Sequence, residues 1–445
     1  MKTLLKNAIL VNEESTIHSD LLIKNQRIEK IASSISTDQA NHTINLNGLH
    51  LLPGLIDDQV HFRQPGYEHK ATIETESKAA LAGGITSYLE MPNTNPQTTT
   101  IDAWNQKYHT ASKSSYANYG FMFGGTNDNL EVIQSLDFKK VPALKLFLGS
   151  STGNMLVDNE TVLRKIFRHT PIRIALHCED ESTIQQNLRK ATNRFGSDIP
   201  IQMHPKIRSH EACLKSTKMA ISLAKETGAK IHIFHLSTRE EVELFSNEIP
   251  LHEKQITSEV CLHHLWFSDE DYAKQGSFIK WNPAIKSVHD RNALWNALID
   301  NRIDVLATDH APHTTIEKSQ SYLNCPSGGP LVQHMLPGLL TCVQQGSLTL
   351  EKLVRKAAHN PAILFDISNR GFLREGYYAD LVVVDLNQTW TVKAKDLLYK
   401  CQWSPFLGET FIGRVTHTFL NGQLVYSDGI VSENKVAQAL TFDRI

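Results

Sequence analysis

The stretch Gly54-Leu55-Ile56-Asp57-Asp58-Gln59-Val60-His61-Phe62-Arg63 opens the part of the chain that decides the fold. After a Pro53-Gly54 turn, its apolar and polar side chains alternate, which is typical of a strand. Successive strand residues point to opposite faces, so Gln59, His61 and Arg63 share one face. This pattern fits a strand that ends at a functional site. It also fits an ordinary strand end with a solvated histidine and arginine.

Further apolar runs follow along the chain, and amphipathic helical patterns lie between most of them. Eight such strand and helix units predict an α/β fold of the (β/α)₈ TIM-barrel type. Catalytic groups of such barrels lie at the C-terminal ends of the strands. The predicted strands are residues 54–62, 86–91, 119–123, 143–148, 172–178, 230–236, 255–261 and 303–309.

Both ends of the chain carry short alternating runs with little helical periodicity. Near the C-terminal end, Asn421-Gly422 lies between two such runs and is a strong hairpin signal. We therefore expect residues 1–52 and 367–445 to pair into one small β-sandwich domain. The barrel, residues 53–366, would be inserted between them.

The composition is that of an ordinary globular protein. The 445 residues are 41% hydrophobic and 21% charged, with a formal net charge of −2, so neither nucleic acid nor a membrane is an expected partner. The sequence has no run of about 18 apolar residues that would predict a membrane span, and no pattern typical of an export signal. Its six cysteines show no CxxC spacing, which predicts reduced thiols and a cytoplasmic location.

Four residues with metal-binding side chains lie at the ends of predicted strands, namely His61, His177, His235 and Asp309. Taken singly, each is more often a hydrogen-bonded core or capping residue. Together they favour a zinc site, because Zn²⁺ prefers imidazole nitrogens and carboxylates. Asp309 could also carry a proton between water and a leaving nitrogen.

Lys145 lies inside the apolar run 143–148, where an ammonium group is costly to desolvate. Two interpretations remain open. The side chain could extend to water at the barrel mouth, or a depressed pKa could let the amine take up CO₂ and form a metal-bridging carbamate. His232 lies three residues before His235, so strand alternation predicts opposite faces, and we interpret His232 as structural.

Asn93 and Asn282 lie in loops that follow predicted strands. Their amides suit recognition of an amide or a carboxylate, although neighbouring prolines also fit plain turns. The polar segment 314–327 follows the last strand and is predicted to be a mobile loop over the barrel mouth.

Six motifs, in order, resemble those of the class I dihydroorotases of the cyclic amidohydrolase superfamily. The resemblance covers nearly the whole chain. The motifs are residues 54–66, 91–96, 145–154, 258–265, 280–283 and 307–313.

This resemblance implies reversible ring closure of N-carbamoyl-L-aspartate to dihydroorotate, in pyrimidine synthesis, with zinc as the cofactor. It also implies that Asp309 is the general base and acid. The implied metal positions are His61, Lys145, His177, His235 and Asp309. The implied substrate contacts are His61, Arg63, Asn93, Asn282 and His313.

One position departs from the family pattern, because Gln59 stands where the family has the first histidine of His-x-His. An amide oxygen is a poor zinc ligand. We therefore expect one tightly held zinc between His177 and His235, and a weaker or absent second ion near His61. Carboxylation of Lys145 and assembly into homodimers stay open.

Two alternatives to a dihydroorotase remain. The first is another cyclic amidohydrolase, acting on dihydropyrimidines, hydantoins or allantoin. Arg63 and Asn93 argue against it, because neutral rings lack a carboxylate for these groups to bind. The second is a non-catalytic homologue, which the presence of Asp309, His177 and His235 disfavours.

Overall fold

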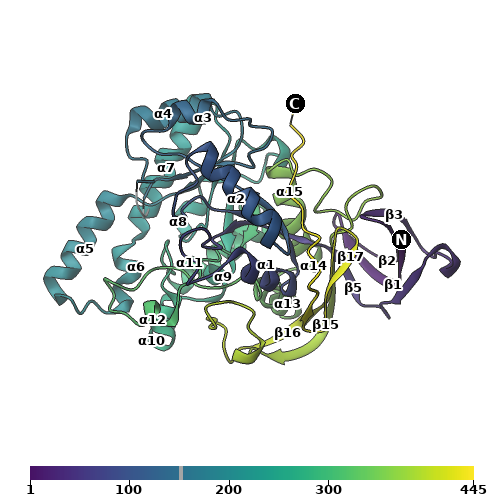
Figure 1. The fold of residues 1–445 in the computed structure, drawn as a ribbon. Coiled ribbons are helices and arrows are strands. Elements are labelled where there is room, and N and C mark those ends of the chain that lie inside the picture. The colour runs from purple at the N-terminus through teal and green to yellow at the C-terminus, as the bar shows by residue number, and fades with distance from the viewer. Residues whose placement is uncertain (150–153, 445) are drawn as a thin grey trace.

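The computed structural model describes residues 1–149 and 154–444, so Ser150–Gly153 of the fourth-strand motif and residue 445 lie outside the described residues. Figure 1 shows the helices grouped around the barrel, with a sheet at one side that combines N-terminal strands (purple) with strands from late in the chain (yellow-green). The barrel strands coincide with the eight predicted runs, and the predicted fold class is confirmed. They are β6 (Leu55–Val60), β7 (Ile85–Glu90), β8 (Asn118–Phe121), β9 (Phe123–Gly124), β10 (Leu144–Phe147), β11 (Ile174–His177), β12 (Ile231–Ile233), β13 (Ile256–Cys261) and β14 (Val305–Ala307).

The barrel strands are parallel and form two ladders, β6-β7-β8 and β9-β10-β11-β12-β13-β14. β8 and β9 are successive pieces of the third barrel strand, interrupted at Met122. At the opposite seam, Val60 bridges His310, and the backbone N–H of His61 donates to the His310 carbonyl at 2.7 Å. The ring of strands therefore closes at the end of the stretch that contains His61.

Amphipathic helices surround the barrel because each has one apolar face to bury. In α4 the buried side chains are Leu163, Ile166 and Phe167, which share one side of the helix. Within the described residues, no helix is both long enough and apolar enough to cross a membrane. The helices are α1 (Ile73–Ala82), α2 (Ile101–Ser114), α3 (Leu130–Gln134), α4 (Glu160–His169), α5 (Glu181–Phe195), α6 (His204–Ile207), α7 (His210–Thr227), α8 (Arg239–Val242), α9 (Leu262–Trp266), α10 (Tyr272–Gln275), α11 (Val288–Ile299), α12 (Thr315–Lys318), α13 (Met335–Gln344), α14 (Leu350–Val354) and α15 (Asn360–Leu364).

The two ends of the chain share one sheet, as predicted, because β5 pairs antiparallel with β15. Its hydrogen-bonded path is continuous, in the order β18-β17-β16-β15-β5-β1-β2-β3, with β4 beside β1. Asn421-Gly422 forms the turn between β16 and β17. The strands are β1 (Lys2–Asn12), β2 (Ser15–Lys24), β3 (Arg27–Ala32), β4 (His42–Asn45), β5 (His50–Pro53), β15 (Leu381–Thr391), β16 (Thr410–Leu420), β17 (Gln423–Ser427) and β18 (Ile430–Val431).

Candidate active site

A cavity of about 670 Å³ opens where the barrel strands end. It brings together every predicted site residue except Lys145, which lies buried within β10. Gln59 also lines this cavity. The predicted residues around it are His61, Arg63, Asn93, His177, His235, Asn282, Asp309 and His313.

One side of the cavity is built from two histidines, His177 at the end of β11 and His235 just beyond β12. His177 Nδ1 lies 3.0 Å from His235 Nε2, and His177 Nε2 lies 2.9 Å from Glu179 Oε2. Arg208 Nη2 donates to the same carboxylate oxygen at 2.7 Å. Burial alone would raise the pKa of Glu179, but Arg208 and His177 lower it below its usual range. Glu179 is therefore a carboxylate that accepts the Nε2–H of His177. The lone pair of His177 Nδ1 then faces His235 and could bind a metal ion.

The other side contains His61 and Asp309, with His61 Nε2 3.3 Å from Asp309 Oδ1. His61 Nδ1 lies 2.8 Å from Asn93 Oδ1. An amide oxygen only accepts, so Nδ1 carries the hydrogen and Nε2 presents its lone pair. Burial raises the pKa of Asp309 to about 7. Gln59 also lies on this side, with its Oε1 3.9 Å from the Cys261 thiol. This side therefore contains one imidazole, one carboxyl group and one neutral amide.

Lys145 is fully buried, and this disfavours the interpretation in which its ammonium group extends to water. Its Nζ lies 4.0 Å from the centre of the Phe234 ring and 4.7 Å from that of Phe147. Among the described residues, Nζ has no hydrogen-bond partner. Burial lowers its pKa to about 7, so a substantial fraction of the amine is neutral near neutral pH.

Arg63 is held at the cavity wall by contacts from the loop after β14. Its Nε donates to the Pro312 carbonyl at 3.0 Å, and its Nη2 lies 3.0 Å from His313 Nε2. Lys70 Nζ lies 3.2 Å from His313 Nδ1. Burial lowers the pKa of Arg63 to about 10, which still leaves the guanidinium charged at neutral pH. The cavity therefore has a fixed cationic wall next to the imidazole and carboxylate groups.

The segment 314–327, predicted to be a mobile loop, has internal order. It contains α12, and the buried Lys318 donates from Nζ to the carbonyls of Lys280, Pro326 and Gly328 at 3.3, 3.0 and 2.9 Å. Tyr322, Leu323, Pro326 and Ser327 line the cavity. Mobility of this segment stays a prediction.

Sequence reasoning missed the Glu179–Arg208 pair and misplaced His232. Glu179 could have been found, because it lies two residues after His177 and strand alternation puts both on one face. Alternation fails between His232 and His235, since β12 ends at Ile233 and the backbone turns at His235, with φ of 39°. Both side chains consequently lie on the inner side of the barrel.

Comparisons with known proteins identify the family and the fold. The model of the Amidohydrolase family matches residues 50–425. A dihydroorotase from Halobacterium salinarum is 34% identical, covering 93% of this chain and 94% of its own length. One from Staphylococcus epidermidis is 32% identical, covering 96% and 98%.

Solved structures with the same fold include the L-hydantoinase (dihydropyrimidinase) from Arthrobacter aurescens. It superimposes with a TM-score of 0.93 at 27% identity, covering 99% of both chains. The dihydropyrimidinase from Brevibacillus agri gives a TM-score of 0.90 at 23% identity, covering 100% of both, which bears on the fold alone.

Proposed function

The chain belongs to the amidohydrolase family, and from this premise we propose that it is a zinc-dependent dihydroorotase. It closes N-carbamoyl-L-aspartate to dihydroorotate and, in reverse, hydrolyses the ring amide. One observation carries the proposal: Arg63 lines the same cavity as four side chains that can bind a metal ion. These are His61, His177, His235 and Asp309. A substrate with a hydrolysable amide next to a carboxylate fits such a cavity.

The residues present fit a zinc ion. His177 Nδ1 and His235 Nε2 are imidazole nitrogens that face each other at 3.0 Å, a little closer than neighbouring ligands on tetrahedral zinc, and Glu179 orients His177. Lys145 supports a carbamate, because its buried Nζ lacks a hydrogen-bond partner among the described residues and a neutral amine is the form that takes up CO₂. Bound zinc supplies Lewis-acid activation of water and of the amide carbonyl.

Asp309 is proposed to move the proton. In hydrolysis, the oxygen of water adds to the ring carbonyl carbon, the carbon–nitrogen bond breaks and the ring nitrogen takes up a proton. A carboxyl group whose pKa is about 7 can accept the water's proton and return it to that nitrogen at neutral pH. Ring closure runs through the same positions in the opposite order.

Arg63 is proposed to bind the substrate carboxylate, with Asn93, Asn282 and His313 completing the substrate contacts. Its Nε is used by the Pro312 carbonyl, and this contact fixes the plane of the guanidinium. The fixed plane directs the remaining N–H groups and reduces the entropy lost on binding.

The compartment and the assembly are also proposals. All six cysteines are free and buried, which supports a reducing compartment such as the cytoplasm. A homodimer stays a prediction.

The test is a comparison of substrates with the zinc-supplemented protein. We expect hydrolysis of dihydroorotate to exceed that of dihydrouracil or hydantoin. Arg63→Met should raise KM for dihydroorotate about 10- to 100-fold, because charge-assisted hydrogen bonds worth about 1.5–3 kcal/mol are lost. Rates with dihydrouracil should change little.

Arg164→Met is the matched control, since it removes a guanidinium that pairs with Glu160 and Glu226 on the surface. Absence of turnover in either direction would contradict the proposed enzyme. A preference for hydantoin would instead favour the activity named in the Arthrobacter structure.

A further inference from the structure

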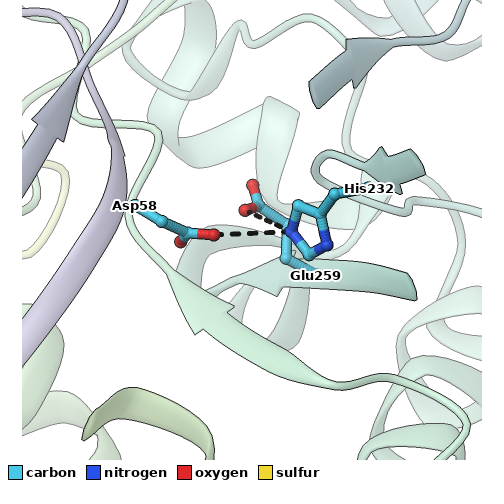
Figure 2. A group of neighbouring side chains, drawn as sticks. All are labelled: Asp58, His232 and Glu259. Carbon is cyan, nitrogen blue, oxygen red and sulfur yellow. Dashed lines mark hydrogen bonds and ion pairs between the residues drawn. The ribbon is translucent and has the colours of Figure 1, made fainter. Parts of the chain in front are cut away.

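A second group of ionisable side chains lies inside the barrel, below the cavity that holds the candidate active site. Asp58 on β6, His232 on β12 and Glu259 on β13 are all fully buried. Figure 2 shows that both carboxylates point at the same nitrogen of His232. Asp58 Oδ2 lies 3.4 Å and Glu259 Oε2 lies 3.3 Å from His232 Nε2.

Neighbouring hydrogen bonds decide which nitrogen of His232 carries its hydrogen. Thr257 Oγ1 donates to the Ile231 carbonyl at 3.1 Å and accepts from Arg173 Nη1 at 3.0 Å. Since the hydroxyl hydrogen is already used, its 2.8 Å contact with His232 Nδ1 requires Nδ1–H as the donor. A neutral His232 therefore presents the bare lone pair of Nε2 to the carboxyl groups of Asp58 and Glu259. Burial and the neighbouring Asp58 raise the pKa of Glu259, so this group of side chains is neutralised either by a proton on Glu259 or by a cation at its centre.

Asp58 gives an independent sign of a missing partner. Neither of its carboxylate oxygens accepts a hydrogen bond among the described residues, although the side chain is fully buried. The adjacent Asp57, equally buried, accepts from Thr308 Oγ1 at 2.5 Å, Thr308 N at 3.2 Å and Gln59 N at 3.3 Å. An unpaired buried carboxylate is costly, so the contrast indicates that Asp58 binds something other than a protein donor.

The distances from His232 Nε2 to the two carboxylate oxygens match those in a metal site. Ligand atoms at about 2.0–2.2 Å from tetrahedral zinc lie about 3.3–3.6 Å from one another. The two distances, 3.3 and 3.4 Å, fall in this range, and both lie at or beyond the long end of the range for an N···O hydrogen bond. All three ligand atoms lie within 4.8 Å of one another.

We propose that Asp58, His232 and Glu259 bind a divalent cation of the zinc or manganese type, separate from the metal at the barrel mouth. Asp58 belongs to the ladder β6-β7-β8, whereas His232 and Glu259 belong to the ladder that runs from β9 to β14. The cation would therefore link the two ladders across the interior of the barrel. Glu259 Oε1 also accepts from the backbone N–H of His235 at 3.2 Å, which connects this inner site to the mouth.

The test measures metal content and metal position, independently of activity. Protein saturated with zinc or manganese and then desalted should lose one ion per chain on Asp58→Asn, a nearly isosteric change. The double variant His177→Asn/His235→Asn should keep that ion. Asp57→Asn is the matched control, because it removes a carboxylate from the same strand outside the cluster and should leave the metal content unchanged.

Anomalous diffraction from wild-type crystals soaked in zinc or manganese salts gives a second readout that needs no variant. A peak between Asp58, His232 and Glu259 is expected. Its absence would overturn the proposal and indicate that a proton, on Glu259 or on His232, neutralises the cluster. Unchanged metal content in folded Asp58→Asn protein would overturn it equally. Absence of dihydroorotase activity in wild-type protein that holds the inner ion would contradict the proposed function and leave this site standing.

Discussion

The two sides of the candidate active site differ in how completely their ligand atoms are supported. On one side, His177 and His235 present two imidazole nitrogens, and Glu179 and Arg208 fix the orientation of His177. On the other side, the neutral amide of Asn93 orients His61. Gln59, two residues earlier in the chain, lines the same cavity. We propose that the first side offers two imidazole nitrogens to a metal ion, whereas the second side offers one, because Gln59 is an amide.

In the proposed metal centre, this difference would separate two functions within one barrel. The His177 side would hold one ion tightly, whereas the His61 side would serve the proposed proton transfer by Asp309 and the proposed substrate binding by Arg63. We therefore propose a single tight ion next to a site that stays open to water and substrate. The following predictions test the difference between the sides.

The largest effect is expected from Asp309→Asn, which alters the His61 side. The amide cannot accept a proton from water, and general-base catalysis is worth roughly 10² to 10⁴ in rate. Steady-state hydrolysis of dihydroorotate should therefore fall by about that factor, while the zinc bound at His177 and His235 stays. Retention of most activity by a folded variant would assign proton transfer to another group.

Lys145→Ala tests whether the two sides share a ligand. If Lys145 carries a carbamate, the variant should lose most activity and recover part of it in acetate or propionate, because a free carboxylate can occupy the space of the carbamate. The measurement is turnover against acid concentration, with sodium chloride at equal ionic strength as the control. Full activity without added acid would exclude a bridging carbamate.

Glu179→Gln tests whether Glu179, by orienting His177, strengthens zinc binding at His177 and His235. Removing the partner of a metal-binding histidine typically weakens metal binding about 10- to 100-fold. Competition with a chelator should show such a loss of zinc affinity, whereas Glu226→Gln, an exposed carboxylate on α7, should behave as wild type. Equal affinities in both variants would mean that Glu179 orients Arg208 rather than His177.

The smallest effect is expected from Gln59→His, which adds a nitrogen donor to the incomplete side. Metal content should rise toward one further ion at the mouth, and the affinity at His177 and His235 should stay the same. Gln59→Ala is the matched control and should leave the metal content unchanged. A loss of metal in Gln59→Ala would show that the amide itself is a ligand.

Sequence periodicity was sufficient for the barrel and for bringing most of the candidate residues to one cavity. Alternation predicted that Gln59, His61 and Arg63 share one face, and all three line the cavity, Gln59 from β6 and the other two from the residues just beyond it. The reason is that a strand fixes side-chain direction locally, so a single segment carries the information. The Asn421-Gly422 signal likewise needed only its own turn geometry.

Other features depend on segments far apart in the chain, and periodicity does not contain them. Asp58 is apposed to His232 only because β6 and β12 lie on different walls of one barrel. Arg208 reaches Glu179 from the residue after α6, and no spacing between them predicts that contact. The direction of His235 depends on a positive φ, which alternation cannot represent.

The pairing of β5 with β15 has a consequence for folding during synthesis on the ribosome. β5 and β1 are made first, but the strand that covers the other edge of β5 follows the entire barrel. At a synthesis rate of about 5–20 residues per second, β15 is made on the order of tens of seconds after β5. During this interval the free edge of β5 is a template for pairing with other nascent chains.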